Sequence, residues 1–211
     1  MESTENLILV PTDYSEVADC AINHALKLAS FLQGKIILMH VVAKEDEVKS
    51  NMEKLQKIAD ELQRLHIIKI SPMVKVGNIF DDIGGVAKEI NARLIIMGTH
   101  GVKGFQHITG SYAIKVITNS STPFIVVQKR KIRDGYGQIV LPMDMTKETK
   151  QKVELTIKMA QYFNSKVHIF TPLETGEFES NKVTRNMFFA IKELEKNGIA
   201  YDTKVAEKSG N

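Results

Sequence analysis

The residues best suited to chemistry are an acid behind one apolar run and a group of glycines behind another. Asp13 follows the apolar run 7–11. The glycine group follows the run 94–97 and consists of Gly98, Gly101 and Gly110, with Ser111 directly after it. Glycines let main-chain N–H groups approach an anion closely, whereas a carboxylate repels phosphate and suits hydroxyl or amino donors. The two stretches together indicate a site for a phosphorylated ligand that also carries hydrogen-bond donors.

The segment 110–119 is expected to form a helix that begins at the last glycine. The unpaired N–H groups and partial positive charge of its N-terminus would stabilise an anion, and the Ser111 hydroxyl would add a hydrogen bond. His100 and His107 lie in the same stretch and raise the alternative of a catalytic base. That alternative is the weaker one, because no Ser-His-Asp or Cys-His constellation accompanies them. A third alternative also remains, in which the glycine stretch serves only as a turn.

Apolar runs alternate with helix-like periodicity along the first 128 residues. The expected strands are 7–11, 35–42, 68–76, 93–98 and 123–128. The first expected helix follows Ser15 and ends near Gly34, and the others cover 48–62, 79–91 and 110–119. Alternation of this kind predicts an α/β fold with a doubly wound, parallel five-stranded sheet in the order 3-2-1-4-5. Pro72 cannot donate to a ladder, so the third strand is expected near an edge.

The predicted order brings the acid and the glycines together. Ligands of open parallel sheets bind beyond the carboxyl ends of the strands, where the strand order reverses. In this sheet the reversal lies between the first and fourth strands. Asp13 follows the first and Gly98 ends the fourth, so we expect them at one site.

The pattern restarts after residue 137. "IVLPMD" at 139–144 echoes "ILVPTD" at 8–13, and "KVHIFTPL" at 166–173 echoes "KIILMHVV" at 35–42, both 131 positions later. The terminal "EKSGN" echoes the "KVGN" before the third helix at an offset of 133. A near-constant offset with matching elements indicates a tandem duplication. We therefore expect a complete domain at 1–130, a linker at 131–137 and a partial second domain at 138–211 with three strands and two helices.

The partial copy would leave its first strand, normally central, at an exposed edge. Either the chain is a fragment of a longer one, which we favour, or another chain or loop completes the sheet. Asp144 is the counterpart of Asp13, but no glycine loop follows in the second copy, so this copy is not expected to bind a nucleotide alone.

Composition and charge limit the partners and the cellular location that we expect. The net charge is only +3 with the basic residues spread along the chain, which predicts no nucleic-acid partner. The sequence has one cysteine, an N-terminus without a basic start or a long apolar stretch, and no apolar run of membrane-spanning length. These features predict a cytoplasmic protein without a membrane partner. His40 and His168 lie in expected strands and are interpreted as structural, so no metal site is expected.

The motifs "ILVPTDYSE", "IILMHVV" and "MGTHGVKG" with the later "GS" and "PFIVV" resemble the universal stress protein family in a tandem form. The resemblance implies a Rossmann-like fold of the adenine nucleotide alpha hydrolase type and, in one subclass, bound ATP, here expected with Mg²⁺. It places adenine at Pro11, Thr12, Asp13 and the main chain of Val41. The ribose and phosphates would lie at Gly98, Gly101, Gly110 and Ser111, with Met97 and His100 lining the site.

The glycine spacing departs from that subclass by one residue. Eight residues separate Gly101 from Gly110, where the family pattern has nine. Two functions stay open: an ATP-binding stress-response module without robust catalysis, at most a weak ATPase, and an interaction or dimerisation protein with the same fold. The resemblance also implies a homodimer through the strand 123–128.

Overall fold

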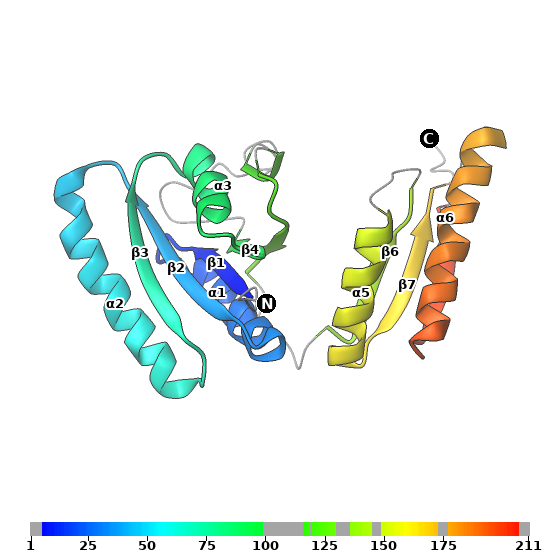
Figure 1. Ribbon diagram of the computed structural model, residues 1–211, viewed down its shortest axis with the longest axis horizontal. Helices are drawn as coiled ribbons and strands as arrows, with labels where there is room; N and C mark the ends of the chain where they lie inside the picture. The colour runs from blue at the N-terminus through cyan, green and yellow to red at the C-terminus, as the bar shows by residue number, and fades with distance from the viewer. Residues whose placement is uncertain are drawn as a thin grey trace, which may run out of the picture. The chain divides into compact units, whose positions relative to one another are not determined.

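The protein forms two compact units, Met1–Ile132 and Arg133–Asn211. The computed structural model describes residues 6–98, 116–118, 120–129, 136–144, 149–172 and 177–206. Each unit has its own parallel sheet and its own helices (Figure 1).

The sheet of the first unit has the predicted strand order. Its strands are β1 (Leu7–Pro11), β2 (Lys35–Val42), β3 (Ile70–Val76), β4 (Leu94–Gly98) and β5 (Phe124–Val127). They are all parallel and lie in the order β3-β2-β1-β4-β5, which confirms the prediction. The strand with Pro72 lies at the edge, where a missing N–H costs no ladder bond.

Within residues 6–98, three helices and one short 3-10 turn connect the strands. They are α1 (Glu16–Leu32), the turn η1 (Glu45–Glu47), α2 (Val48–Leu65) and α3 (Ile79–Glu89). Ser15 caps α1 as expected, because its hydroxyl accepts a hydrogen bond from the N–H of Ala18 at 3.2 Å. Of the helix expected at 110–119, only residues 116–118 are described, and they are helical.

The helices cover both faces of the sheet. Leu9 and Met39 lie fully buried on one face, where they pack with Ile83 and Ala87 of α3. Successive side chains of a strand point to opposite faces, so Ile8, also fully buried, faces the layer made by α1 and α2. Burial on both faces explains why β1 and β2 are apolar almost throughout.

The second unit is smaller. Its elements are β6 (Gln138–Pro142), α5 (Thr149–Phe163), β7 (Lys166–Thr171), α6 (Glu177–Lys196) and β8 (Tyr201–Val205). The strands are parallel in the order β6-β7-β8. Leu141, Val167 and Ile169 point to the same face and form a core with Val153 of α5 and Leu194 of α6.

The strands of the second sheet pair in the same register as the corresponding strands of the first. In the first unit Leu7 pairs with Lys35 and Ile36 with Ile70; in the second Gln138 pairs with Lys166 and Val167 with Tyr201. Each residue of the second set lies 131 positions after its counterpart. The backbone bond from Thr12 N–H to the Met39 carbonyl returns as the bond from Met143 to Phe170, both at 2.8 Å. Three strands of each unit therefore superimpose in pairing as well as in order.

The helix ends also correspond. Gln33, which caps the C-terminus of α1, has the left-handed conformation with φ 49° and ψ 43°. Asn164, 131 positions later, follows α5 with φ 50°. The left-handed region suits glycine and, less well, asparagine, so glutamine is the costlier of the two residues here.

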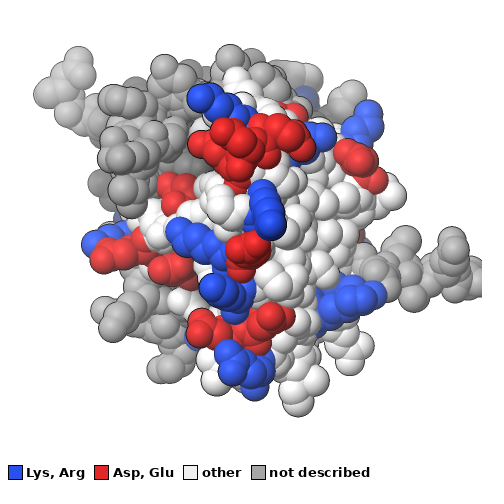
Figure 2. All heavy atoms as spheres, turned by 90° about the vertical axis from the view of Figure 1, so that its left-hand side faces the viewer, with Lys and Arg blue, Asp and Glu red and all other residues white. Residues whose placement is uncertain are grey.

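The outer surface of the first unit carries charges of both signs. Exposed Lys49, Glu53, Lys57 and Asp60 follow one another along α2. On the side that Figure 2 shows, blue and red side chains are interspersed over the face. Such a pattern is typical of a solvated helix face. No helix in the described part of the chain is long and apolar enough to cross a membrane.

We predict that Gln33→Gly stabilises the first unit. Gln33 is exposed and its φ of 49° strains a residue with a Cβ, so glycine should raise the free energy of unfolding by about 0.5–1 kcal/mol. Thermal unfolding of the whole chain measures the change. Gln33→Ala keeps the Cβ and serves as the control, and equal melting temperatures for the two variants would contradict the explanation.

Candidate functional site

The sheet brings the ends of β1 and β4 side by side. Ile8 pairs with Leu94, and the Arg93 N–H donates to the Leu7 carbonyl at 2.8 Å. From β1 the chain proceeds to β2 and β3 on one side, whereas β4 and β5 lie on the other. The reversal of strand order therefore falls between β1 and β4. Asp13 follows one strand and Gly98 ends the other, at the same edge of the sheet.

Thr12 fixes the path of the chain after β1. Its N–H donates to the Met39 carbonyl at 2.8 Å, and its hydroxyl accepts from the Tyr14 N–H at 3.1 Å. Its carbonyl lies 2.7 Å from Nδ1 of His40, and because a carbonyl only accepts, this nitrogen carries the proton. Thr12 is itself buried. These bonds anchor the loop to β2, and His40 has a structural role in it.

Asp13 lies half-buried between this anchored threonine and the start of α1. Its Oδ1 accepts from the Ser15 N–H at 3.1 Å, while the Ser15 hydroxyl caps the helix. These bonds hold the Asp13 side chain close to the helix N-terminus. Its position at the carboxyl edge is the one that the sequence predicted for a ligand-facing acid.

The first turn of α1 adds two further acids to this region. Glu16 forms an ion pair with Lys129, which follows β5 and, through its hydrogen bond and charge, lowers the pKa of that carboxyl. The pKa of Asp19 is raised, first by burial and then by the charges of Asp13 and Glu16. Three carboxyl groups thus lie near the start of α1, and Lys129 offsets the charge of one of them.

Tyr14 connects the same loop to α2, a connection that sequence reasoning missed. Its hydroxyl donates to Oδ1 of Asn51 at 3.2 Å, and its ring centroid lies 4.5 Å from that of His40. The ammonium of Lys54 lies 3.4 Å from the ring centroid, within cation–π distance. Burial raises the pKa of Tyr14 to about 12, so the hydroxyl remains a donor at neutral pH.

Tyr14 also adopts an uncommon backbone conformation, with φ 63°. Few non-glycine residues adopt this region, and those that do are held there by their surroundings. The contacts with Asn51 and Lys54 supply such surroundings. No local sequence signal for the contacts exists, because the partners are 37 and 40 positions away.

The other predicted site residues within the described chain lie at the strand ends. Val41 lies near the end of β2 and is partly exposed. Pro11 is buried at the end of β1. The Met97 side chain is 1% exposed and packs in the core with Leu9 and Ile95, so only its main chain is available to a ligand.

Gly98 ends β4 where the strand passes close to α1. A Cβ added there would lie 2.4 Å from Cγ1 of Val17 and 2.9 Å from the Val17 carbonyl oxygen. Only glycine fits this approach without displacing the helix. The first glycine of the loop therefore has a packing function besides any function in binding.

The remaining predicted site residues lie outside the described residues: His100, Gly101, Gly110 and Ser111. The chain is described again from Val116, which is fully buried beside Leu9 and Met97 in the core. The residues between Gly101 and Gly110, one fewer than in the family pattern, also lie outside the described residues.

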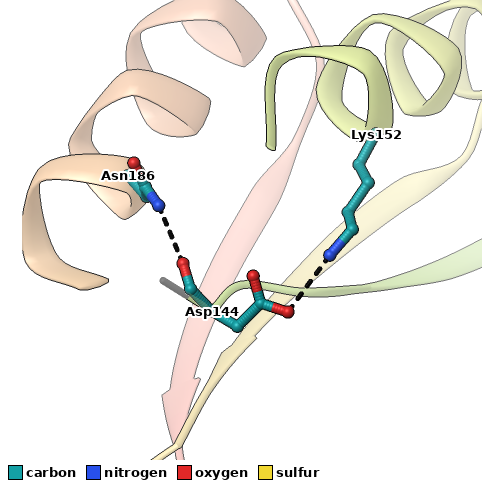
Figure 3. A network of polar contacts seen from close by, with 3 residues as sticks. All are labelled: Asp144, Lys152 and Asn186. Carbon is teal, nitrogen blue, oxygen red and sulfur yellow. Dashed lines mark hydrogen bonds and ion pairs between the residues drawn. The ribbon is translucent and has the colours of Figure 1, made fainter. Parts of the chain in front are cut away.

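The equivalent position of the second unit has different chemistry. Oδ2 of Asp144, the counterpart of Asp13, lies 3.2 Å from Nζ of Lys152 on α5. Its carbonyl accepts from Nδ2 of Asn186 on α6 at 2.8 Å (Figure 3). The carboxylate is thus paired with a cation of its own unit, and residue 21, the counterpart of Lys152 in the first unit, is alanine.

Comparison with known proteins identifies the family. A sequence model described as the universal stress protein family matches residues 6–128. The chain belongs to the universal stress protein family. The universal stress protein MJ0577 of Methanocaldococcus jannaschii is 27% identical over 154 residues, which cover 58% of this chain and 94% of that protein. MJ0531 of the same organism is 30% identical over 150 residues, covering 60% of this chain and 86% of the relative.

A solved universal stress protein extends the likeness to both units. The structure from Archaeoglobus fulgidus matches with a TM-score of 0.74 and 20% identity, covering 95% of this chain and 76% of that chain. At this identity the match shows a shared fold. The universal stress fold thus accounts for the parallel sheet on which the site lies.

We predict that Gly98→Ala destabilises the first unit by about 1–3 kcal/mol, because the new methyl group overlaps Val17. Gly85→Ala is the matched control, since a Cβ at exposed Gly85 in α3 would meet no atom within 4 Å. Alanine should stabilise that helix by up to ~1 kcal/mol. Urea unfolding compares the two variants, and equal midpoints would contradict the packing function of Gly98.

Proposed function

We propose that the first unit binds an adenine nucleotide, ATP with Mg²⁺, at the carboxyl ends of β1, β2 and β4. The observation that carries the proposal is the junction of an acid-ended strand with a glycine-ended strand where the strand order reverses. Parallel sheets bind ligands at this point. The family resemblance supports the identity of the ligand.

The site divides between the two ends of a nucleotide. Pro11, Thr12, Asp13 and the main chain of Val41 would bind adenine and the ribose, whose hydroxyl groups donate to a carboxylate. The phosphates would lie at the Gly98 end, with His100, Gly101, Gly110 and Ser111 assigned by the family pattern.

The proposed activity is binding, with at most slow ATP hydrolysis. Phosphoryl transfer needs a positioned base and a metal clamp. In the described parts of the chain no three His, Cys, Asp or Glu side chains lie together as a metal site would require. We assign no catalytic residue.

We infer that binding is communicated through Tyr14 to α2. Tyr14 directly follows Asp13, and its ring and hydroxyl contact Lys54 and Asn51 of α2. A ligand that favours one state of the loop would also favour one arrangement of these contacts. The exposed face of α2 is then the surface on which a cytoplasmic stress-response partner would detect the bound state.

We further propose that the second unit is a partial copy of the first that has lost the nucleotide site. The shared register of three strands supports the duplication. The pairing of Asp144 with Lys152 supports the loss, because the carboxylate is already neutralised. One nucleotide per chain is the stoichiometry that follows.

The competing function is interaction without a ligand. β5 is the short edge strand of the first sheet, and Val126 on it is 38% exposed. Edge strands can pair with another chain. A homodimer through β5 is compatible with both functions, so the nucleotide must be tested directly.

We predict that millimolar ATP with Mg²⁺ raises the melting temperature of the full chain. A ligand at 100 times its Kd adds about 2.7 kcal/mol to the free energy of unfolding. Asp13→Asn keeps an acceptor for the Ser15 N–H but removes the charge, and should reduce this stabilisation by about 1.5–3 kcal/mol. Glu89→Gln, which removes an exposed carboxylate from the last turn of α3 ahead of the start of β4, is the control and should keep it.

Binding of inorganic triphosphate tests whether Asp13 contacts the nucleoside or the phosphates. If Asp13 contacts the nucleoside, Asp13→Asn weakens ATP but leaves triphosphate binding equal or stronger, because a repelling charge is gone. Equal weakening of both ligands would place Asp13 at the phosphates and contradict the assignment. Absence of any shift with ATP would favour the interaction protein.

We also predict that Tyr14→Phe uncouples α2 from the site. The hydroxyl bond to Asn51 is lost, at a cost of about 0.5–1.5 kcal/mol, while the ring contacts remain. ATP affinity should change by less than about threefold, but ATP should no longer slow hydrogen exchange at the start of α2. Unchanged protection of α2 in this variant would refute the coupling.

A further inference from the structure

Lys129 is a cation near the carboxyl edge of the first sheet that the proposed function leaves unassigned. It follows β5, whose Val127 pairs with Gly98 at the end of β4. Two residues of chain span at most about 7 Å, so the backbone of Lys129 begins close to the point where these two strands end. Lys129 therefore lies at the same edge of the sheet as Asp13 and Gly98.

A series of contacts joins Lys129 to Gly98 through the start of α1. Nζ of Lys129 forms an ion pair with Oε2 of Glu16, the first residue of that helix. The next residue, Val17, lies against Gly98, because a Cβ added to Gly98 would lie 2.4 Å from Cγ1 of Val17. Gly98 in turn pairs with Val127, two positions before Lys129. The ion pair is therefore beside the glycine at which the proposed phosphate site begins.

The ion pair between Lys129 and Glu16 lies at the protein surface. The two side chains are 69% and 73% exposed. The hydrogen bond from Lys129 to Glu16, together with the charge of the carboxylate, raises the pKa of the ammonium group, so it is charged at neutral pH. An ion pair this exposed contributes little to stability, because water screens it. Lys129 can therefore exchange one anionic partner for another at little cost.

Charge determines which partner the ammonium of Lys129 prefers. Glu16 offers one negative charge, whereas a nucleoside triphosphate carries several on adjacent phosphates. Coulomb attraction grows with the charge of the partner, and lysine binds phosphate as a point charge. The four-carbon side chain of lysine is flexible, so the ammonium can turn towards the Gly98 end without a change in the backbone.

The acids at the start of α1 oppose this exchange. Burial and then the charges of Asp13 and Glu16 raise the pKa of Asp19, so the three carboxyl groups interact with one another. Lys129 offsets the charge of Glu16. An ammonium that turns to a phosphate restores that charge beside the other two acids. Glu16 is therefore expected to weaken the binding of any ligand that takes Lys129 from it.

We propose that Lys129 is a phosphate-binding residue of the first unit and that Glu16 competes with the ligand for its ammonium group. This role rests on the proposed function, since the phosphates are those of the nucleotide at Gly98. It adds a side-chain cation to a phosphate site that the family pattern assigns to glycines, a histidine and a serine. The ligand class that follows is a nucleoside polyphosphate, distinguished from its nucleoside by one lysine.

Calorimetric titration of the full chain with ATP and with adenosine separates contacts to the phosphates from contacts to the nucleoside. Lys129→Met should weaken ATP about tenfold and leave adenosine unchanged, because only ATP carries the charge that the ammonium binds. Lys88→Met removes the same charge from the exposed last turn of α3, ahead of the start of β4, and should change neither Kd. An unchanged ATP affinity, or an equal loss for ATP and adenosine, would overturn the proposal.

Glu16→Gln tests the competition. It should strengthen ATP about threefold or more, and this gain should disappear in a chain that also carries Lys129→Met, because the two residues act on one ammonium group. An equal gain with and without Lys129 would reveal a general charge effect and refute the exchange. A loss of ATP affinity would refute it as well, since Glu16 would then hold Lys129 in place for the ligand.

Inorganic triphosphate distinguishes a failure of this role from a failure of the proposed function. A chain that binds triphosphate through Lys129 but does not bind adenosine would contradict the nucleotide and support the phosphate contact. A chain that binds ATP equally well with and without Lys129 would support the nucleotide and overturn the contact. Failure to bind either ATP or triphosphate would overturn both.

Discussion

The structure depends on one topological constraint: all strands of a parallel sheet end at the same edge, and the strand order reverses once. β1 lies at that reversal and is held by β2 on one side and β4 on the other. Its buried side chains fix it from both faces. The loop that carries Asp13 and the strand that ends at Gly98 are therefore adjacent whatever their separation in sequence.

The sequence predicts those elements in which each local preference agrees with the global fold. The run 35–42 becomes a strand with the predicted bounds, because it is apolar on both faces and flanked by helical periodicity. Pro72 marks an edge strand for a covalent reason that no packing alters. Tyr14 is different: its left-handed backbone and its bond to Asn51 arise from a helix 37 positions away. Likewise the fit of Gly98 against Val17 and the burial of Met97 depend on the distance between α1 and β4.

The two units show how one backbone accepts two kinds of side chain. The pairing of three strands and the left-handed ends of α1 and α5 are alike in both. The contacts of the equivalent acids, Asp13 and Asp144, differ, since Asp144 is paired with Lys152 of its own unit. The face beneath α3 is apolar in the first unit, whereas its equivalent carries His168 and Asp202 in the second. Backbone pairing thus constrains the fold, while side chains on the sheet are free to acquire other partners.

The link between Lys152 and Asp144 has a consequence for how the second unit can change over time. The segments around Asp144 can change in length or composition without breaking its ion pair with Lys152, because both partners belong to one unit, where Asp144 follows β6 and Lys152 lies on α5. Under the proposed function, natural variation in the two halves should then be unequal. Ligand binding would restrain the carboxyl edge of the first sheet, and folding alone that of the second.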